Sequence, residues 1–83
     1  MPEIRVTVKL FSHLKSALAR GELDLVLPSG ATTADVESTV RGMGGPALEK
    51  LPLHVALNYE YCLAPRPLAD GDEVALLPPV QEG

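Results

Sequence analysis

The residue types that could perform chemistry in this 83-residue chain are few and scattered. His13 and His54 lie far apart in the sequence, with no Cys, Asp or Glu at the spacing of metal ligands. We therefore interpret both as ordinary surface or partly buried histidines. Cys62, the single cysteine, has no histidine close to it in the sequence and lies among apolar residues. This context favours a buried structural thiol over a nucleophile.

Two further segments look like binding loops but lack the required pattern. Asp70, Asp72 and Glu73 lie close together, yet the twelve-residue ligand pattern of a calcium loop and its distal glutamate are missing, so we predict a charged hairpin turn. The stretch GMGG, residues 42–45, follows a predicted helix instead of opening one, so it lacks the donor geometry of a phosphate loop. The sequence thus predicts no metal site and no catalytic site within the chain.

The C-terminal stretch LPPVQEG offers a different kind of chemistry, that of a terminal carboxylate. Pro78 has no amide hydrogen, and Pro79 biases it toward extended geometry, so the preceding strand should end there with the chain directed outward. Residues 80–83 would reach roughly 13 Å when extended. Gly83 has no side chain to obstruct attack at its own carbonyl. We expect residues 1–79 to form one domain and residues 80–83 to form a flexible tail.

The composition excludes several classes of protein. The chain is 46% hydrophobic and 22% charged, which is typical of a globular domain, and its length allows a single core. Its formal charge of −4 argues against nucleic acid or an anionic membrane as the main partner and suits a basic protein surface. The single cysteine and the absence of a recognisable signal peptide predict a cytoplasmic protein.

In the N-terminal half, segments with the period-two pattern of a strand alternate with segments whose apolar residues have helical spacing. Period-two alternation predicts strands at residues 4–10 and 23–27. Between them, Phe11, Leu14 and Leu18 have the spacing of a short amphipathic helix that should stop at Gly21.

The main helix is predicted at residues 33–43. Thr32 can cap its N-terminus while Asp35 reaches back in a capping box. Val36, Val40 and Met43 form its apolar stripe, and the helix should break in the glycine-rich segment that follows.

The residue pattern of the C-terminal half predicts a series of strands. Leu53, Val55 and Leu57 alternate in a third strand, and residues 58–61 should form a turn. The segment at residues 62–68 contains two prolines and should be irregular or at a sheet edge. Residues 74–77 are all apolar, which predicts a central strand covered on both faces. This order predicts an α+β fold with one sheet and the main helix on one face.

Four segments together resemble the MoaD-type sulfur carriers of the MoaD/ThiS ubiquitin-like family, the small subunits of molybdopterin synthase: VKLFSHLKSAL, LPSGATTADV, VALN and LADGDEVALLPPV. The thiamine-pathway carriers are usually shorter and lack the paired prolines, so they match less well. The resemblance implies a β-grasp, ubiquitin-like fold with a mixed sheet. Its first and last strands should lie side by side and parallel in the middle of that sheet.

The resemblance also implies a role in molybdenum cofactor biosynthesis. An E1-like adenylyltransferase would use ATP to adenylate the terminal carboxylate, which a sulfur donor enzyme would then convert to a thiocarboxylate. The chain itself would bind no cofactor. The tail would enter the large subunit of molybdopterin synthase, within a heterotetramer, and that subunit would dock on the exposed sheet face around apolar residues. The residues implied are the reactive Gly83 and the tail residues Pro78, Pro79, Val80, Gln81 and Glu82.

Two positions depart from the family pattern. Glu82 stands where the family has the first glycine of a Gly-Gly end, and Tyr59 stands where glycine is common. A buried unpaired charge at Glu82 would cost several kcal/mol in a tunnel built for diglycine. The chain could be a carrier whose partners accept Glu82, the native end could differ, or the domain could keep the fold without carrying sulfur. The alternative functions are therefore a sulfur carrier for another pathway and a β-grasp interaction module.

Overall fold

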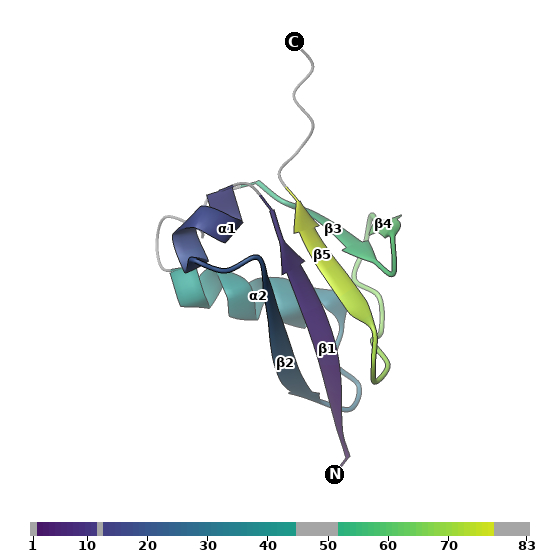
Figure 1. The fold of residues 1–83 in the computed structure, drawn as a ribbon. Helices are drawn as coiled ribbons and strands as arrows, with labels where there is room; N and C mark the ends of the chain where they lie inside the picture. Colours follow the sequence, from purple (N-terminus) through teal and green to yellow (C-terminus); the bar gives the residue numbers. More distant parts are fainter. Residues whose placement is uncertain (1, 12, 45–51, 78–83) are drawn as a thin grey trace.

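A computed structural model of the chain describes residues 2–11, 13–44 and 52–77. The described chain contains five strands in one sheet and two helices (Figure 1). In chain order they are β1 (Glu3–Leu10), α1 (His13–Leu18), β2 (Glu22–Pro28), α2 (Thr33–Gly44), β3 (His54–Leu57), β4 (Glu60–Cys62) and β5 (Glu73–Leu77). The predicted domain boundary at residue 79 and the predicted tail lie outside the described residues.

The sheet has the order β2-β1-β5-β3-β4, so the first and last strands are neighbours inside it (Figure 1). β1 and β5 run parallel, with Thr7 opposite Glu73 and Leu10 opposite Leu76. The other strand pairs are antiparallel. Parallel pairing needs a long crossover, which the intervening helices and strands supply. The predicted mixed sheet and its parallel central pair are confirmed.

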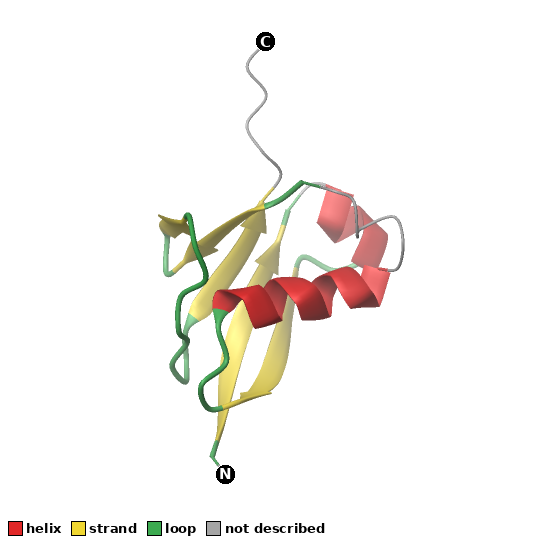
Figure 2. Cartoon of the chain, turned by 180° about the vertical axis from the view of Figure 1, so that it is seen from behind, coloured by secondary structure: helices red, strands yellow, loops and turns green. Residues whose placement is uncertain are grey.

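Helix α2 lies across one face of the sheet and closes the core (Figure 2). Alternate residues of β1 and β5 point toward it, and Val6, Val8, Val74 and Leu76 are fully buried there. Val36 and Val40 of the helix are also fully buried. The alternation read from the sequence is thus the inward and outward alternation of the pleated strands.

The start of α2 differs in detail from the predicted capping box. The Thr32 backbone N–H donates to Asp35 Oδ2 at 2.7 Å, as predicted. The Thr32 hydroxyl, however, also donates to this carboxylate, at 3.3 Å, while the Asp35 N–H donates to the Thr32 carbonyl at 3.0 Å. The next residue, Thr33, is 2% exposed, and its Oγ1 accepts from the Arg66 backbone N–H at 3.0 Å. The helix start thereby holds the irregular segment before β5.

The end of α1 is set by Ala19, one of the residues with a left-handed backbone, with φ of 58°. The Arg20 N–H donates back to the Lys15 carbonyl at 3.2 Å, which closes the last turn. The sequence predicted that the helix would stop at Gly21, two residues later, because glycine is the usual residue in this conformation. Leu14 is buried as expected, whereas Phe11, also assigned to the apolar stripe, is 43% exposed.

The predicted four-residue turn at residues 58–61 is shorter in the structure. Strands β3 and β4 pair through Leu57 and Glu60, so only Asn58 and Tyr59 form the turn. Their φ angles are 49° and 72°, the geometry of a two-residue turn with both central residues left-handed. Tyr61, which was assigned to the turn, is therefore part of edge strand β4.

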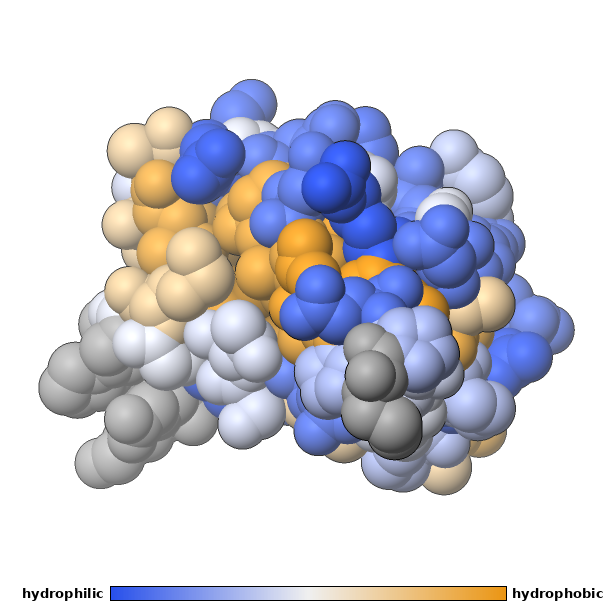
Figure 3. Space-filling model, turned by 90° about the horizontal axis from the view of Figure 1, so that it is seen from below, coloured by the Kyte–Doolittle hydropathy of each residue, from blue (hydrophilic) through white to orange (hydrophobic). Residues whose placement is uncertain are grey.

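The end of the molecule at which the chain starts shows hydrophobic surface bordered by hydrophilic side chains (Figure 3). Val26 and Met43 are each about half exposed. Met43 was expected in the apolar stripe of α2 with the two buried valines.

Neither described helix is both long enough and apolar enough to cross a membrane.

Candidate functional site

The face of the sheet away from α2 is the open face, and its central row crosses four strands. Lys9 of β1 is opposite Ala75 of β5, Ala75 is opposite Ala56 of β3, and Ala56 is opposite Tyr61 of β4. The next row along the pleat, which contains Val8, Val74 and Leu57, is buried. Because side chains alternate between faces, the first row must point away from the core.

A hollow of about 240 Å³ lies on this open face, and we call it the aromatic hollow. Two small side chains, Ala56 and Ala75, lie at its centre in the middle of the sheet. Ala56 is only 6% exposed although it belongs to the open-face row, because larger side chains surround it. The residues that give the hollow its apolar lining are Phe11, Ala56, Tyr59, Tyr61, Ala75 and Leu77.

The aromatic side chains around the hollow are unusually exposed for their size. Tyr59 is 89% exposed, Tyr61 63% and Phe11 43%. The Tyr61 ring contacts the His54 ring edge to face, with the ring centroids 6.1 Å apart. An exposed group of aromatic residues beside a hollow is typical of a protein-binding surface.

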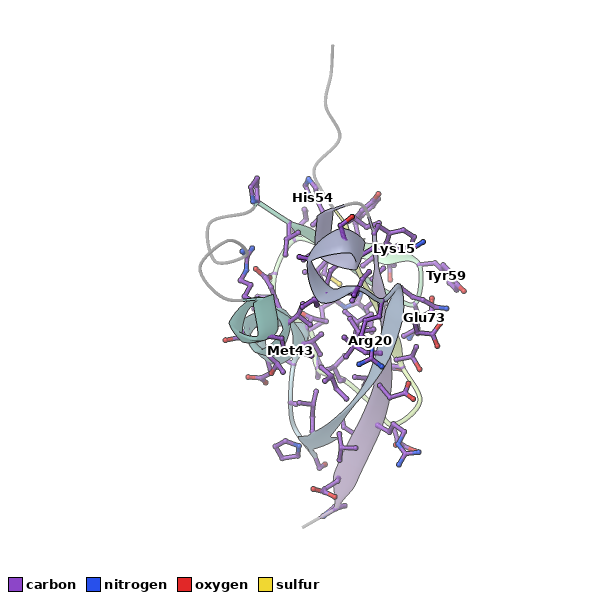
Figure 4. All side chains as sticks on the ribbon, turned by 60° about the vertical axis from the view of Figure 1, so that its left-hand side comes forward. Lys15, Arg20, Met43, His54, Tyr59 and Glu73 are labelled. Atoms are coloured by element: carbon purple, nitrogen blue, oxygen red, sulfur yellow. The ribbon has the colours of Figure 1, made fainter. Side chains whose placement is uncertain are left out.

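The turn that carries Tyr59 is anchored by its neighbour Asn58. The Asn58 side-chain amide donates to Asp72 Oδ1 at 3.1 Å, and its Oδ1 accepts from the Glu73 backbone N–H at 3.0 Å. The Asn58 N–H also donates to the Glu73 carbonyl at 2.8 Å. These bonds tie the turn to the start of β5. In Figure 4, Tyr59 and Glu73 extend on the same side of the molecule.

Two charged residues, Lys9 and Glu73, complete the lining of the hollow. The Lys9 ammonium lies 2.6 Å from Glu22 Oε1. This hydrogen bond and the charge of Glu22 raise the pKa of Lys9 above its ordinary value of 10.5. In the described part of the chain, the Glu73 carboxylate forms no hydrogen bond and no ion pair, although its charge acts on Lys9.

The C-terminal end of β5 adjoins the aromatic hollow. Leu77, the last residue of β5, lines the hollow and is opposite His54 in the sheet. His54 is exposed, as predicted, and lies at the end of the molecule where β5 ends (Figure 4). The implied site residues Pro78, Pro79, Val80, Gln81, Glu82 and Gly83 lie outside the described residues, and so does the side chain of His13.

The remaining candidates from the sequence have local structural partners. Asp70 Oδ1 accepts from the Arg5 N–H and Asp72 Oδ2 from the Ala69 N–H, both at 2.8 Å, so these carboxylates fix the turn before β5. Cys62 was predicted to be buried, but it is half-buried at the edge of the core, and its thiol points to the Glu60 carbonyl at 3.6 Å. Its packing agrees with a structural role for the thiol.

The aromatic hollow was not predicted from the sequence. Tyr61 and Phe11 were assigned to a turn and to a helix stripe, and Tyr59 was noted only as a departure from glycine. The signal was the pairing of Ala56 with Ala75, two small residues in neighbouring strands, but it becomes visible only once the register is known.

The model of the ThiS family matches residues 8–83, which is most of the chain. The chain belongs to the ThiS family. No curated protein matches the sequence.

Solved structures agree with this assignment. A molybdopterin converting factor, subunit 1, from Pyrococcus furiosus is 26% identical, with a TM-score of 0.82 over 93% of this chain and 99% of that chain. Small archaeal modifier protein 1 from Haloferax volcanii is 28% identical, with a TM-score of 0.79 over 93% and 99% of the two chains. A Caldiarchaeum subterraneum ubiquitin, 18% identical with a TM-score of 0.64 over 99% and 100%, shares the fold. The predicted ubiquitin-like β-grasp fold is confirmed.

Proposed function

We propose that this ThiS-family chain is a sulfur carrier and the small subunit of a molybdopterin synthase. The observation that carries the proposal is the family match, which extends from β1 through the C-terminal segment. The 26% identity to a molybdopterin converting factor, subunit 1, favours this branch. The chain would work in the cytoplasm and would form part of a sulfurtransferase complex without a catalytic site of its own.

In the proposed reaction, Gly83 supplies the reacting group. A carboxylate is a poor electrophile, so an E1-like enzyme joins it to the AMP part of ATP and releases pyrophosphate. A hydrosulfide ion supplied by the donor enzyme then attacks the carbonyl carbon, AMP leaves with the bonding electrons, and the S–H proton passes to water. The product is a thiocarboxylate in which sulfur replaces one carboxylate oxygen. Pro78, Pro79, Val80, Gln81 and Glu82 would carry this group into the large subunit, where the sulfur passes to a pterin precursor.

The described structure supports this role through strand β5, which ends at Leu77. Strand β5 pairs with β1 on one side and with β3 on the other, so the chain is held in the sheet as far as Leu77. The open face beside Leu77 carries the exposed aromatic residues that a docking partner would cover. One solved complex of similar fold contains subunits 1 and 2 of a molybdopterin-converting factor from Helicobacter pylori. We propose a large subunit of that kind as the partner, in a heterotetramer.

Intact-mass spectrometry tests the carrier function. The chain is incubated with the activating enzyme of its own organism, ATP and a sulfur source. A mass increase equal to the exchange of one oxygen for sulfur, located at Gly83, is expected. An unchanged mass, under conditions in which a known carrier is converted, would refute the carrier function and leave an interaction module.

The Glu82→Gly variant tests the departure from the family pattern. If the partner tunnels are built for diglycine, removing the charge should speed adenylation or sulfur delivery, and each ~1.4 kcal/mol of relieved desolvation is worth tenfold in rate. A gain in adenylation alone would assign the obstruction to the activating enzyme, and a gain in delivery alone would assign it to the large subunit. Equal rates for both forms would show that the partners accommodate Glu82.

A second candidate function is protein modification, favoured by the 28% identity to small archaeal modifier protein 1. The same activated carboxyl group would then be attacked by a lysine amine of a target protein. Peptides in which Gly83 is joined to a lysine side chain, found in cells that express a tagged chain, would establish this function. A carrier for another sulfur-transfer pathway would form the thiocarboxylate but show no affinity for the large subunit.

A further inference from the structure

Tyr59 occupies a conformation that disfavours its own residue type. At φ of 72° the Cβ atom of any residue except glycine is crowded, which costs roughly 1–2 kcal/mol. Of the four other residues with positive φ in the described chain, two are glycines, Gly30 and Gly71, and the other two, Ala19 and Asn58, have smaller side chains than tyrosine. Because the Tyr59 side chain is 89% exposed, contacts within the domain return little of this cost. The turn requires a positive φ at this position but does not require a tyrosine, so the choice of this residue indicates a role outside the domain.

The place of Tyr59 suggests what that role is. Its side chain lines the aromatic hollow together with Tyr61 and Phe11. The floor consists of alanines, so space remains above the sheet for one large side chain. Leu77 also lines the hollow, so a protein that takes the tail must lie close to this surface.

The charges of the hollow favour a cation. Lys9 is already paired with Glu22 at 2.6 Å, whereas the Glu73 carboxylate has no ion-pair partner among the described residues. The whole chain carries a formal charge of −4, so a basic partner surface is complementary to it. Aromatic faces next to a free carboxylate suit a guanidinium group, which can stack on a ring while it donates two hydrogen bonds to a carboxylate.

We propose that the aromatic hollow, through Tyr59 and Glu73, receives an arginine side chain of the protein that accepts the tail. The inference rests on the proposed function, because it takes the large subunit of molybdopterin synthase as that protein. An apolar side chain would leave the Glu73 charge unpaired on a surface that the complex covers. A second copy of this chain would bring the same negative charge against itself.

The test is the affinity for the large subunit of the same organism, measured by calorimetry with full-length chains at low and high salt. Glu73→Gln should weaken binding about tenfold, and the salt dependence of the affinity should become shallower. Tyr59→Gly should also weaken binding about tenfold while the isolated domain stays folded. The matched control is Glu3→Gln, which removes the same charge at the far end of β1 and should change the affinity less than about twofold.

The outcomes distinguish the arginine assignment, the docking role of the hollow and the proposed function from one another. If the unchanged chain binds the large subunit and both variants bind as tightly as the Glu3→Gln control, the inference is wrong and the proposed function stands. If Tyr59→Gly weakens binding but Glu73→Gln does not, the occupant is apolar and the arginine assignment is wrong. A concentration-dependent dimer that Tyr59→Gly abolishes would assign the hollow to a second copy. No binding by the unchanged chain would refute the proposed function and the inference together.

Discussion

Replacing Tyr59 with glycine should make the isolated domain more stable, although it removes a large aromatic side chain. The left-handed backbone at φ of 72° costs a tyrosine roughly 1–2 kcal/mol and costs glycine almost nothing. Glycine loses more backbone entropy on folding, about 0.5–1 kcal/mol. The lost packing is small because the side chain is 89% exposed. The net gain should therefore be about 0.5–1 kcal/mol.

Chemical and thermal unfolding both measure this gain. For a domain of this size, a gain in that range raises the melting temperature by roughly 3–6 °C. In urea the midpoint should move up by about 0.5 M with an unchanged slope. Tyr59→Ala is the control, since it removes the ring but keeps the Cβ atom that causes the crowding. The alanine variant should be no more stable than the unchanged chain.

Two results would refute this reasoning. Equal stabilisation by alanine and glycine would show that removal of the ring, and not the backbone conformation, is responsible. A loss of stability in the glycine variant would show that the Tyr59 ring stabilises the domain more than its exposure implies. The turn itself should persist in every variant, because the three hydrogen bonds that Asn58 forms with Asp72 and with Glu73 at the start of β5 do not involve Tyr59.

Three further perturbations probe the core, the helix start and the open face. Leu76→Ala should lower the free energy of unfolding by about 3 kcal/mol, measured in urea, because the side chain is fully buried beneath α2. Thr33→Val keeps the shape but leaves the Arg66 N–H without its acceptor, so it should cost about 1–3 kcal/mol and speed amide exchange at Arg66. The Lys9 pKa, followed by NMR, should lie above 10.5 and fall toward it in Glu22→Gln. Because the folded-state pKa is raised, the stabilisation from this pair is present below the unfolded pKa and is lost as the pH rises through the folded value.

Most of the fold was predictable because the local patterns of this chain agree with its tertiary structure. The apolar residues of β1 alternate at period two and are the residues that face α2. The apolar run at residues 74–77 predicted a central strand, and β5 is flanked by β1 and β3. The same run also predicted cover on both faces, which is wrong, because Ala75 and Leu77 are only partly buried on the open face. The predictions were wrong where single residues deviate from their usual preferences. Ala19, not a glycine, ends α1, and a tyrosine occupies a turn position that usually takes glycine.

The open-face surface was much harder to predict because it depends on register across several strands. Ala56, Ala75 and Tyr61 are far apart in the sequence, and only the pairing of β3 with β4 and β5 brings them into one row. Each residue has an ordinary explanation on its own. The tail chemistry came instead from composition and from resemblance to a family, and it concerns residues outside the described part of the chain.

The parallel pairing of β1 and β5 also determines how the domain should respond to a pulling force. β1 begins at one end of the molecule and β5 ends at the other, and the two strands lie side by side (Figure 1). Tension applied between the two chain ends would slide these strands along each other, so the hydrogen bonds between them would bear the load together instead of opening one after another. An unfolding enzyme that pulls on the C-terminal segment would therefore meet its greatest resistance at β5, the first strand on which the force acts. We expect the domain to withstand extraction by its C-terminus better than its thermodynamic stability alone would indicate.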